Sequence, residues 1–234
     1  MTTGQMPLVL VPGLLCSDDL FSSQVAHFHG RRPIQIGRVL HQDRLEAIAA
    51  HILRTAPSRF ALAGLSLGGY VAFEIMRQAP ERVDRLALLD TNARADRPEQ
   101  VAQRRMLIGL GRTLGVRTVQ AAVLPFLIHR RRLADRALVD RVLNMADAVG
   151  RQAFESQQAA IIARPDNRPF LSEIRCPALV VVGAQDTMTP PKVAEEMHAG
   201  IAGSRLKVID DCGHLSTMEQ PEKVNAALDA WLAD

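Results

Sequence analysis

The sequence has few cysteines and little net charge. Its 234 residues include only Cys16, Cys176 and Cys212, with no C-x-x-C spacing among them. Three cysteines at these spacings supply neither a disulfide framework nor a zinc knuckle, and free thiols are typical of a reducing compartment. The formal net charge is +3, whereas a protein dedicated to nucleic acid concentrates a large basic excess on one face. The sequence therefore predicts a protein without disulfides, structural zinc or a nucleic-acid partner.

Long apolar segments are also missing. The longest apolar runs, such as residues 178–183, fall far short of the ~20 residues that a helix needs to cross a bilayer. Residues 1–7 are polar and lack the charged segment and apolar core of a signal peptide. The sequence contains no internal repeat and no low-complexity tract. We therefore expect a globular, cytoplasmic protein without a membrane partner, made of one domain with at most a modest insertion.

Hydrophobic residues make up 47% of the sequence and occur in alternating patterns. Short runs rich in Val, Leu and Ile predict six strands, at residues 8–11, 34–39, 60–63, 85–90, 177–183 and 205–210. Apolar residues at helical spacing predict helices at 45–55, 67–78 and 224–232. Apolar strands that alternate with helices are typical of a parallel sheet covered on both faces. The sequence thus predicts an α/β fold with a mainly parallel, six-stranded sheet flanked by helices.

The pattern changes between the fourth and the fifth predicted strand. No convincing strand occurs there, and helical spacing recurs at residues 99–110, 116–124, 133–148 and 152–163. The simplest interpretation is an all-helical insertion at 96–168 above a core formed by 1–95 and 169–234. The one charge cluster of this insertion, Arg130–Arg132, is interpreted as the solvated start of a helix, although a contact with an acidic substrate is an alternative.

A glycine-flanked serine lies between a predicted strand and a predicted helix. Residues 64–68 read Gly-Leu-Ser-Leu-Gly, which fits the pattern G-x-S-x-G. At such a junction a strained turn lifts the serine hydroxyl out of the sheet, and the glycines let neighbouring backbone pass close by. A serine hydroxyl is a poor nucleophile until a base removes its proton, and an acid must orient that base. Ser66 is therefore the candidate nucleophile, provided that the chain supplies a base and an acid.

Two residues that follow later strands fit these roles. Asp186 follows the fifth predicted strand and His214 follows the sixth, in the order Ser, Asp, His that is expected for such a site. Both lie at the edge where open parallel sheets place their sites. Asp90, at the end of the fourth strand, is a competing acid, whereas Asp210 lies too near His214 along the chain to be favoured. We predict Ser66, Asp186 and His214 as the catalytic residues.

Five segments of the chain resemble the α/β-hydrolase superfamily, in particular the small bacterial branch that includes 3-oxoadipate enol-lactonases and carboxylesterases. They are residues 9–15, 64–69, 182–186, 213–214 and 219–221. The resemblance implies a cap, in agreement with the helical insertion, and an oxyanion hole formed by the backbone N–H groups of Leu14 and Leu67. Two departures stand out. Pro12 occupies a position where the family usually has His, and the family's first two strands are missing, which leaves six.

The leading interpretation is a serine hydrolase that cleaves a carboxylic ester, lactone or thioester of a small, partly apolar substrate through an acyl-enzyme. This chemistry implies no metal and no organic cofactor, and the expected partner is a small-molecule substrate. Apolar side chains near the site and in the insertion predict an apolar pocket, with Leu15, Phe21, Met106 and Phe126 as candidate lining residues. The sequence does not predict the oligomeric state.

Two other functions stay open at this point. The same fold hosts C–C bond hydrolases and lyases that use a Ser-His-Asp set for proton transfer, and some of its members are thought to be ligand sensors without catalytic activity. A fold by itself does not determine a function. Acylation by an activated ester distinguishes the first interpretation from these two.

Overall fold

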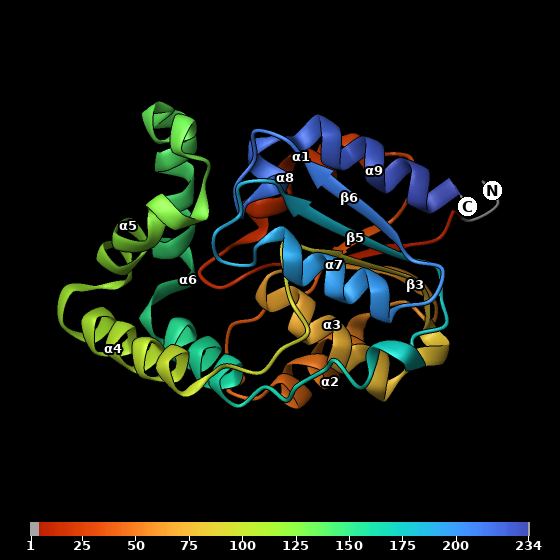
Figure 1. Ribbon diagram of the computed structural model, residues 1–234, viewed down its shortest axis with the longest axis horizontal. Coiled ribbons are helices and arrows are strands. Elements are labelled where there is room, and N and C mark those ends of the chain that lie inside the picture. Colours follow the sequence, from red (N-terminus) through yellow and green to blue (C-terminus); the bar gives the residue numbers. More distant parts are fainter. Residues whose placement is uncertain (1–4, 234) are drawn as a thin grey trace.

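A computed structural model describes residues 5–233, and its centre is one six-stranded sheet (Figure 1). The strands are β1 (Leu8–Val11), β2 (Ile34–Ile36), β3 (Phe60–Leu65), β4 (Val83–Leu89), β5 (Ala178–Gly183) and β6 (Arg205–Ile209). Their order across the sheet is β2-β1-β3-β4-β5-β6, and every neighbouring pair is parallel. The predicted six-stranded α/β fold is confirmed.

One strand is shorter than the sequence predicts. β2 ends at Ile36 rather than at residue 39, and its last partner is Leu10 of β1. β1 ends one residue later and is followed by Pro12, which has no N–H group and therefore stops the ladder. As an edge strand, β2 has no second neighbour that would continue it.

Apolar side chains pack against both faces of the sheet, because successive residues of a strand point to opposite sides. Val9 and Val11 belong to a core cluster under α2 (Leu45–Thr55), α3 (Leu67–Gln78) and α7 (Pro191–Gly200). Leu8 and Leu10 belong to a second cluster, which includes residues of α1 (Ser22–Phe28), α8 (Ser216–Glu219) and α9 (Pro221–Ala233). Both faces are thus buried, as apolar strands require.

Three helices between β4 and β5 form the segment that we call the cap helices. They are α4 (Pro98–Leu114), α5 (Val116–Leu127) and α6 (Arg136–Ile162). Figure 1 shows them beside the sheet, on the side to which the arrows of β5 and β6 point. The sequence predicts two helices where α6 stands, and Gly150 separates them with a φ of 77°. Glycine adopts this left-handed conformation without a steric penalty, so the chain bends there.

The part of the chain that the structure describes also contains four short 3₁₀ helices, which the sequence patterns do not predict. They are η1 (Asp18–Phe21), η2 (Pro80–Arg82), η3 (Arg130–Ala134) and η4 (Leu171–Glu173). The arginine cluster lies in η3, where Arg131 pairs with Asp211 and Arg132 pairs with Asp135. Within residues 5–233, no helix is both long enough and apolar enough to cross a bilayer.

Candidate active site

Ser66 lies at the sharp turn between β3 and α3. Its backbone is in a conformation unusual for a non-glycine residue, with φ 55° and ψ −113°. A Cβ atom at Gly64 would lie 2.2 Å from the carbonyl oxygen of Gly68, and one at Gly68 would lie 1.9 Å from that of Val11. Only glycine fits at these two positions. Strained backbone of this kind is found at functional sites, and here it presents the serine hydroxyl at the carboxyl edge of the sheet.

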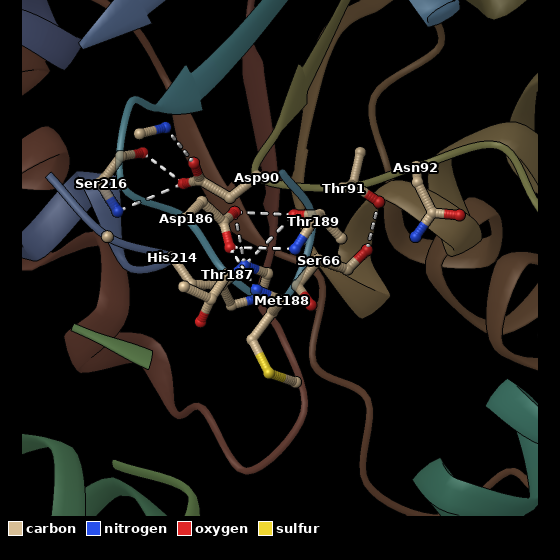
Figure 2. A network of polar contacts seen from close by, with 12 residues as sticks. Ser66, Asp90, Thr91, Asn92, Asp186, Thr187, Met188, Thr189, His214 and Ser216 are labelled. Atoms are coloured by element: carbon tan, nitrogen blue, oxygen red, sulfur yellow. Dashed lines mark hydrogen bonds and ion pairs between the residues drawn. The ribbon is translucent and has the colours of Figure 1, made fainter. Parts of the chain in front are cut away.

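Three side chains that are distant in the sequence form one hydrogen-bonded chain (Figure 2). The Nε2 atom of His214 lies 2.9 Å from the Oγ atom of Ser66. The Nδ1 atom of the same ring lies 2.8 Å from Oδ2 of Asp186. His214 and Asp186 are each only 3% exposed, so water competes little for these hydrogen bonds. The structure therefore brings together all three residues that the sequence predicts as the catalytic set.

The loop after β5 holds the Asp186 carboxylate in place. Oδ1 accepts hydrogen bonds from the backbone N–H groups of Met188 and Thr189, at 2.8 and 2.9 Å. Oδ2 accepts a hydrogen bond from the Thr189 hydroxyl at 2.7 Å. With its other lone pairs occupied, the carboxylate has one orientation, in which Oδ2 faces the His214 ring.

The electrostatic environment raises the pKa of His214 above its ordinary value of 6.5. Burial by itself would lower this pKa, but the charge of Asp186 and its hydrogen bond to the ring outweigh the burial. An imidazole with a raised pKa is a stronger base. The arrangement can therefore remove the Ser66 proton and stabilise the imidazolium that results.

Asp90 is also buried at the site but contacts different groups. It ends β4 and accepts hydrogen bonds from the N–H of Gly183 at 3.0 Å and from the N–H and hydroxyl of Ser216. Figure 2 shows it facing Ser216, while Asp186 faces His214. Burial and the nearby Asp186 charge raise the pKa of Asp90 to about 8. Asp90 thus ties the start of the Asp186 loop to the His214 loop without contacting the imidazole.

Glu219 holds the loop that carries His214. The sequence does not reveal this role. The Glu219 carboxylate accepts hydrogen bonds from the N–H groups of Gly213 at 2.9 Å and His129 at 2.6 Å. Burial raises its pKa. His129 follows α5, so one carboxylate connects the histidine loop with the cap helices. The only signal in the sequence was the segment 219–221, which the family resemblance includes without assigning it a role.

The loop after β1 passes next to Ser66. A Cβ atom at Gly13 would lie 3.4 Å from Cβ of Ser66, and the next residue, Leu14, lines the same cavity as Ser66. Leu67 is the first residue of α3, and the first N–H groups of a helix have no partner within the helix. The two N–H groups that the resemblance implies as an oxyanion hole therefore belong to segments that meet at Ser66.

A cap residue, Gln157 of α6, fixes this loop. Its Oε1 accepts a hydrogen bond from the N–H of Leu15 at 3.0 Å, and its Nε2 donates to the carbonyl of Val39 at 2.6 Å. Leu15 has a φ of 55°, a strained value that an external hydrogen bond helps to maintain. Sequence reasoning missed Gln157, because a glutamine in a helical pattern carries no signal for a contact 142 residues away.

A cavity of about 350 Å³ opens over Ser66 and His214. Leu14 and Leu15 line it from the loop after β1, and Phe126 lines it from α5, together with residues of α4 and α6.

Two predicted pocket residues do not line the cavity, and these predictions are corrected. Phe21 is fully buried in the core cluster beneath α1, and Met106 points outward from α4 with 65% of its surface exposed.

A reactive cysteine or a metal-binding cluster would support a different chemistry at this site. Cys16 lines the cavity, but burial raises the pKa of its thiol to about 12, so it is not a thiolate nucleophile at neutral pH. Across residues 5–233, no cluster of three or more His, Cys, Asp or Glu side chains forms a metal-binding arrangement.

Comparisons with known proteins place this geometry in context. A family model described as the alpha/beta hydrolase fold matches residues 40–221. The chain is 31% identical over 190 residues to a pimeloyl-[acyl-carrier protein] methyl ester esterase of Aromatoleum aromaticum, covering 76% of each chain.

Two solved structures resemble the whole molecule. A thermophilic esterase from Thermogutta terrifontis, solved with malate bound, has a TM-score of 0.89 and 28% identity, and the match covers 98% of this chain and 90% of that one. An enol-lactonase from Burkholderia xenovorans LB400 has a TM-score of 0.87 at 23% identity, with 100% and 94% covered. The second likeness concerns the fold alone.

Proposed function

Because the chain belongs to the α/β-hydrolase family, we propose that it is a serine hydrolase that cleaves a carboxylic ester, lactone or thioester of a small, partly apolar substrate. The observation that carries the proposal is the hydrogen-bonded chain from Ser66 through His214 to Asp186. The esterases among its relatives support the same reaction class. In this proposal residues 1–95 and 169–234 are the catalytic core, and residues 96–168 are a cap that shapes the cavity.

The proposed reaction follows from the geometry of the site. The Ser66 hydroxyl attacks the substrate carbonyl while His214 Nε2 takes its proton. The N–H groups of Leu14 and Leu67 stabilise the negative oxygen of the tetrahedral intermediate. His214 then gives the proton to the leaving alcohol or thiol, and an acyl-enzyme forms on Ser66. Water, deprotonated by His214, attacks this acyl group. His214 then returns the proton to the Ser66 oxygen as the bond to the acyl group breaks, which releases the carboxylic acid and restores the serine.

The cavity supports a small substrate with an apolar part. Its volume of about 350 Å³ lies at the lower end of the range for small-molecule sites. The side chains of Leu15, Val119 and Phe154 contribute apolar lining. Cap helices and core loops both line the cavity, so the cap excludes water from the acyl group and limits its size.

The decisive experiment is covalent trapping combined with a substrate screen. Purified protein is incubated with a fluorophosphonate, and the modified residue is located by mass spectrometry. In parallel, turnover is measured with esters, lactones and thioesters of graded size. We expect modification of Ser66, hydrolysis of at least one of these classes, and neither result with Ser66→Ala. Folded protein that neither reacts with the probe nor turns over any activated ester would overturn the proposal in favour of C–C bond chemistry or ligand sensing.

A further inference from the structure

Besides its apolar residues, the cap wall of the cavity carries polar side chains, none of them negatively charged. Four glutamines and two arginines contribute to the lining on and next to the cap helices: Gln100, Gln103, Arg104, Gln120, Gln158 and Arg164. Among the described residues that line this cavity, none is an aspartate or glutamate. A purely apolar substrate would leave the donors of this wall that have no protein partner unsatisfied, so the wall indicates a substrate with a second polar end.

Gln158 of α6 has a free donor inside the protein. Its side chain is completely buried. Its Oε1 accepts a hydrogen bond from Nη1 of Arg104 at 3.1 Å, whereas its Nε2 has no partner. The guanidinium fixes this orientation, because a flipped amide would place two donors against each other. A buried N–H without a partner is costly, and in a site it marks the place of a missing acceptor.

Gln120 of α5 repeats the same feature on a neighbouring helix. It is 2% exposed, lines the cavity, and its Nε2 also has no partner. By contrast, Gln157, next to Gln158 in the sequence, uses both ends of its amide within the protein. Free amide donors are therefore not a general property of these helices. They occur on the two buried glutamines that line the cavity.

A buried ion-pair network gives the same wall a positive charge. Asp96 pairs with Arg104 at 2.5 Å and with Arg164 at 2.8 Å, and the Asp96 side chain is fully buried. Burial alone would raise the pKa of Asp96, but the hydrogen bonds and charges of the two arginines outweigh it and lower the pKa. Two guanidinium groups around one carboxylate leave one positive charge uncompensated.

We infer that Gln120, Gln158 and Arg104 form a subsite for a carboxylate on the substrate, remote from the ester bond that Ser66 attacks. A carboxylate accepts hydrogen bonds and donates none, so it matches free amide donors of this kind. Its negative charge also balances the net positive charge of the Arg104–Asp96–Arg164 network. This inference rests on the proposed function, since it names the substrate class of the same site: half-esters of dicarboxylic acids, or hydroxy acids that are acylated on the hydroxyl group and keep a free carboxylate.

The test separates binding from catalysis. Calorimetry with the Ser66→Ala protein compares monomethyl with dimethyl esters of dicarboxylic acids of four to eight carbons. Acetate esters of ω-hydroxy acids, each compared with its methyl ester, form a second arm. The first arm places the carboxylate on the acyl side and the second places it on the alcohol side. We expect at least about tenfold tighter binding of the anionic member at one chain length, the effect of charge-assisted hydrogen bonds.

A charged variant of the amide tests the residue directly. Gln158→Glu, made in the Ser66→Ala background, retains an oxygen for Arg104 but replaces the free donor by an acceptor. We expect it to abolish the preference for the anion, while binding of the dimethyl ester changes less than threefold, a factor below about 1 kcal/mol. Gln152→Glu is the matched control, because Gln152 lies exposed on the same helix and outside the cavity. It should keep the preference.

A second variant covers the case in which Gln158→Glu fails to fold, as judged by circular dichroism. Gln158→Met has a similar length and no donor, and should reduce the preference without introducing repulsion. Equal binding of anionic and neutral esters at every length, in both arms, would refute the subsite. So would a preference in Gln158→Met that is as strong as in the parent Ser66→Ala protein. If wild-type protein cleaves no ester but the Ser66→Ala protein still prefers the anion, the subsite stands and the proposed hydrolysis fails.

Discussion

At the carboxyl edge of the sheet, the buried carboxylates of Asp186, Asp90 and Glu219 each accept two or more hydrogen bonds from the protein itself. On the cap wall of the same cavity, Gln120 and Gln158 keep donors without partners. The side chains at the sheet edge, which we call the core half of the site, are fixed before any ligand arrives, as groups that act on a transition state must be. The side chains of the cap wall, which we call the cap half, keep polar groups free for a ligand. In the proposed function, this difference divides chemistry and recognition between core and cap.

The largest expected loss of activity comes from replacing catalytic residues of the core half. Ser66→Ala should reduce kcat by about 10⁶, because the three residues act as a unit and nothing else supplies the nucleophile. His214→Ala should be about as damaging for the same reason. Steady-state kinetics with an activated ester, on protein shown to be folded by circular dichroism, measure both. If Ser66→Ala kept a tenth of the wild-type turnover, the nucleophile would have to be another residue.

The next effect distinguishes the two aspartates of the core half. Asp186→Asn should lower kcat by about 10⁴, since the His214 ring loses the partner that fixes its tautomer. Asp90→Asn keeps an oxygen that accepts from Gly183 and alters only the support of the loop around Ser216. Its cost should be at most about 10²-fold, the effect of a small misplacement. The two variants serve as each other's control, and the reverse ranking would make Asp90 the acid.

Local signals made the core half predictable from the sequence. Pattern G-x-S-x-G requires both glycines for steric reasons, as the approach of Gly68 to Val11 shows. Parallel strands place their carboxyl ends at one edge, so Asp186 and His214 could be assigned without a structure. Order along the chain does not distinguish Asp186 from Asp90, since both lie between Ser66 and His214. The hydrogen bond to His214 Nδ1 supports Asp186.

The cap half was less predictable. Helical periodicity shows which residues share one face of a helix, but not whether that face lies toward the cavity, the core or solvent. Met106 and Phe126 both have large apolar side chains in helical patterns, yet only Phe126 lines the cavity. Phe21 packs into the core instead. The contacts of Gln157 and Glu219 join loops far apart in the sequence, and no local pattern encodes such pairs. The free donors of Gln120 and Gln158 appear only once the burial of each atom is known.

A pH profile tests whether the surroundings of His214 raise its pKa, as the structure indicates. His214 must be neutral to accept the Ser66 proton, and its pKa is raised above 6.5 by Asp186 despite burial. The value of kcat/KM should therefore fall on acidification with a midpoint above pH 6.5. Below that midpoint it should drop about tenfold for each pH unit. The measurement is kcat/KM for a neutral ester between pH 5 and about 9. A midpoint at or below 6.5 would contradict the raised pKa.

The smallest expected effect concerns the cap half, through Phe126 and Met106. Phe126 lines the cavity from α5 although 55% of its surface is exposed, and its carbonyl accepts a hydrogen bond from the Thr187 hydroxyl at 3.3 Å, next to Asp186. We expect Phe126→Ala to remove an apolar contact that a long acyl chain makes and a short one does not.

The ratio of kcat/KM for long over short acyl esters should fall about tenfold in Phe126→Ala, within the range for losing one apolar contact. Acetate turnover should be retained, because a two-carbon acyl group is processed next to Ser66 and His214. Met106→Ala is the matched control: it removes a large apolar side chain of the neighbouring helix that lies outside the cavity. The measurement is a series of 4-nitrophenyl esters from acetate to decanoate. Equal shifts in the two variants would mean that the cap acts through its overall stability rather than through the residues that line the cavity.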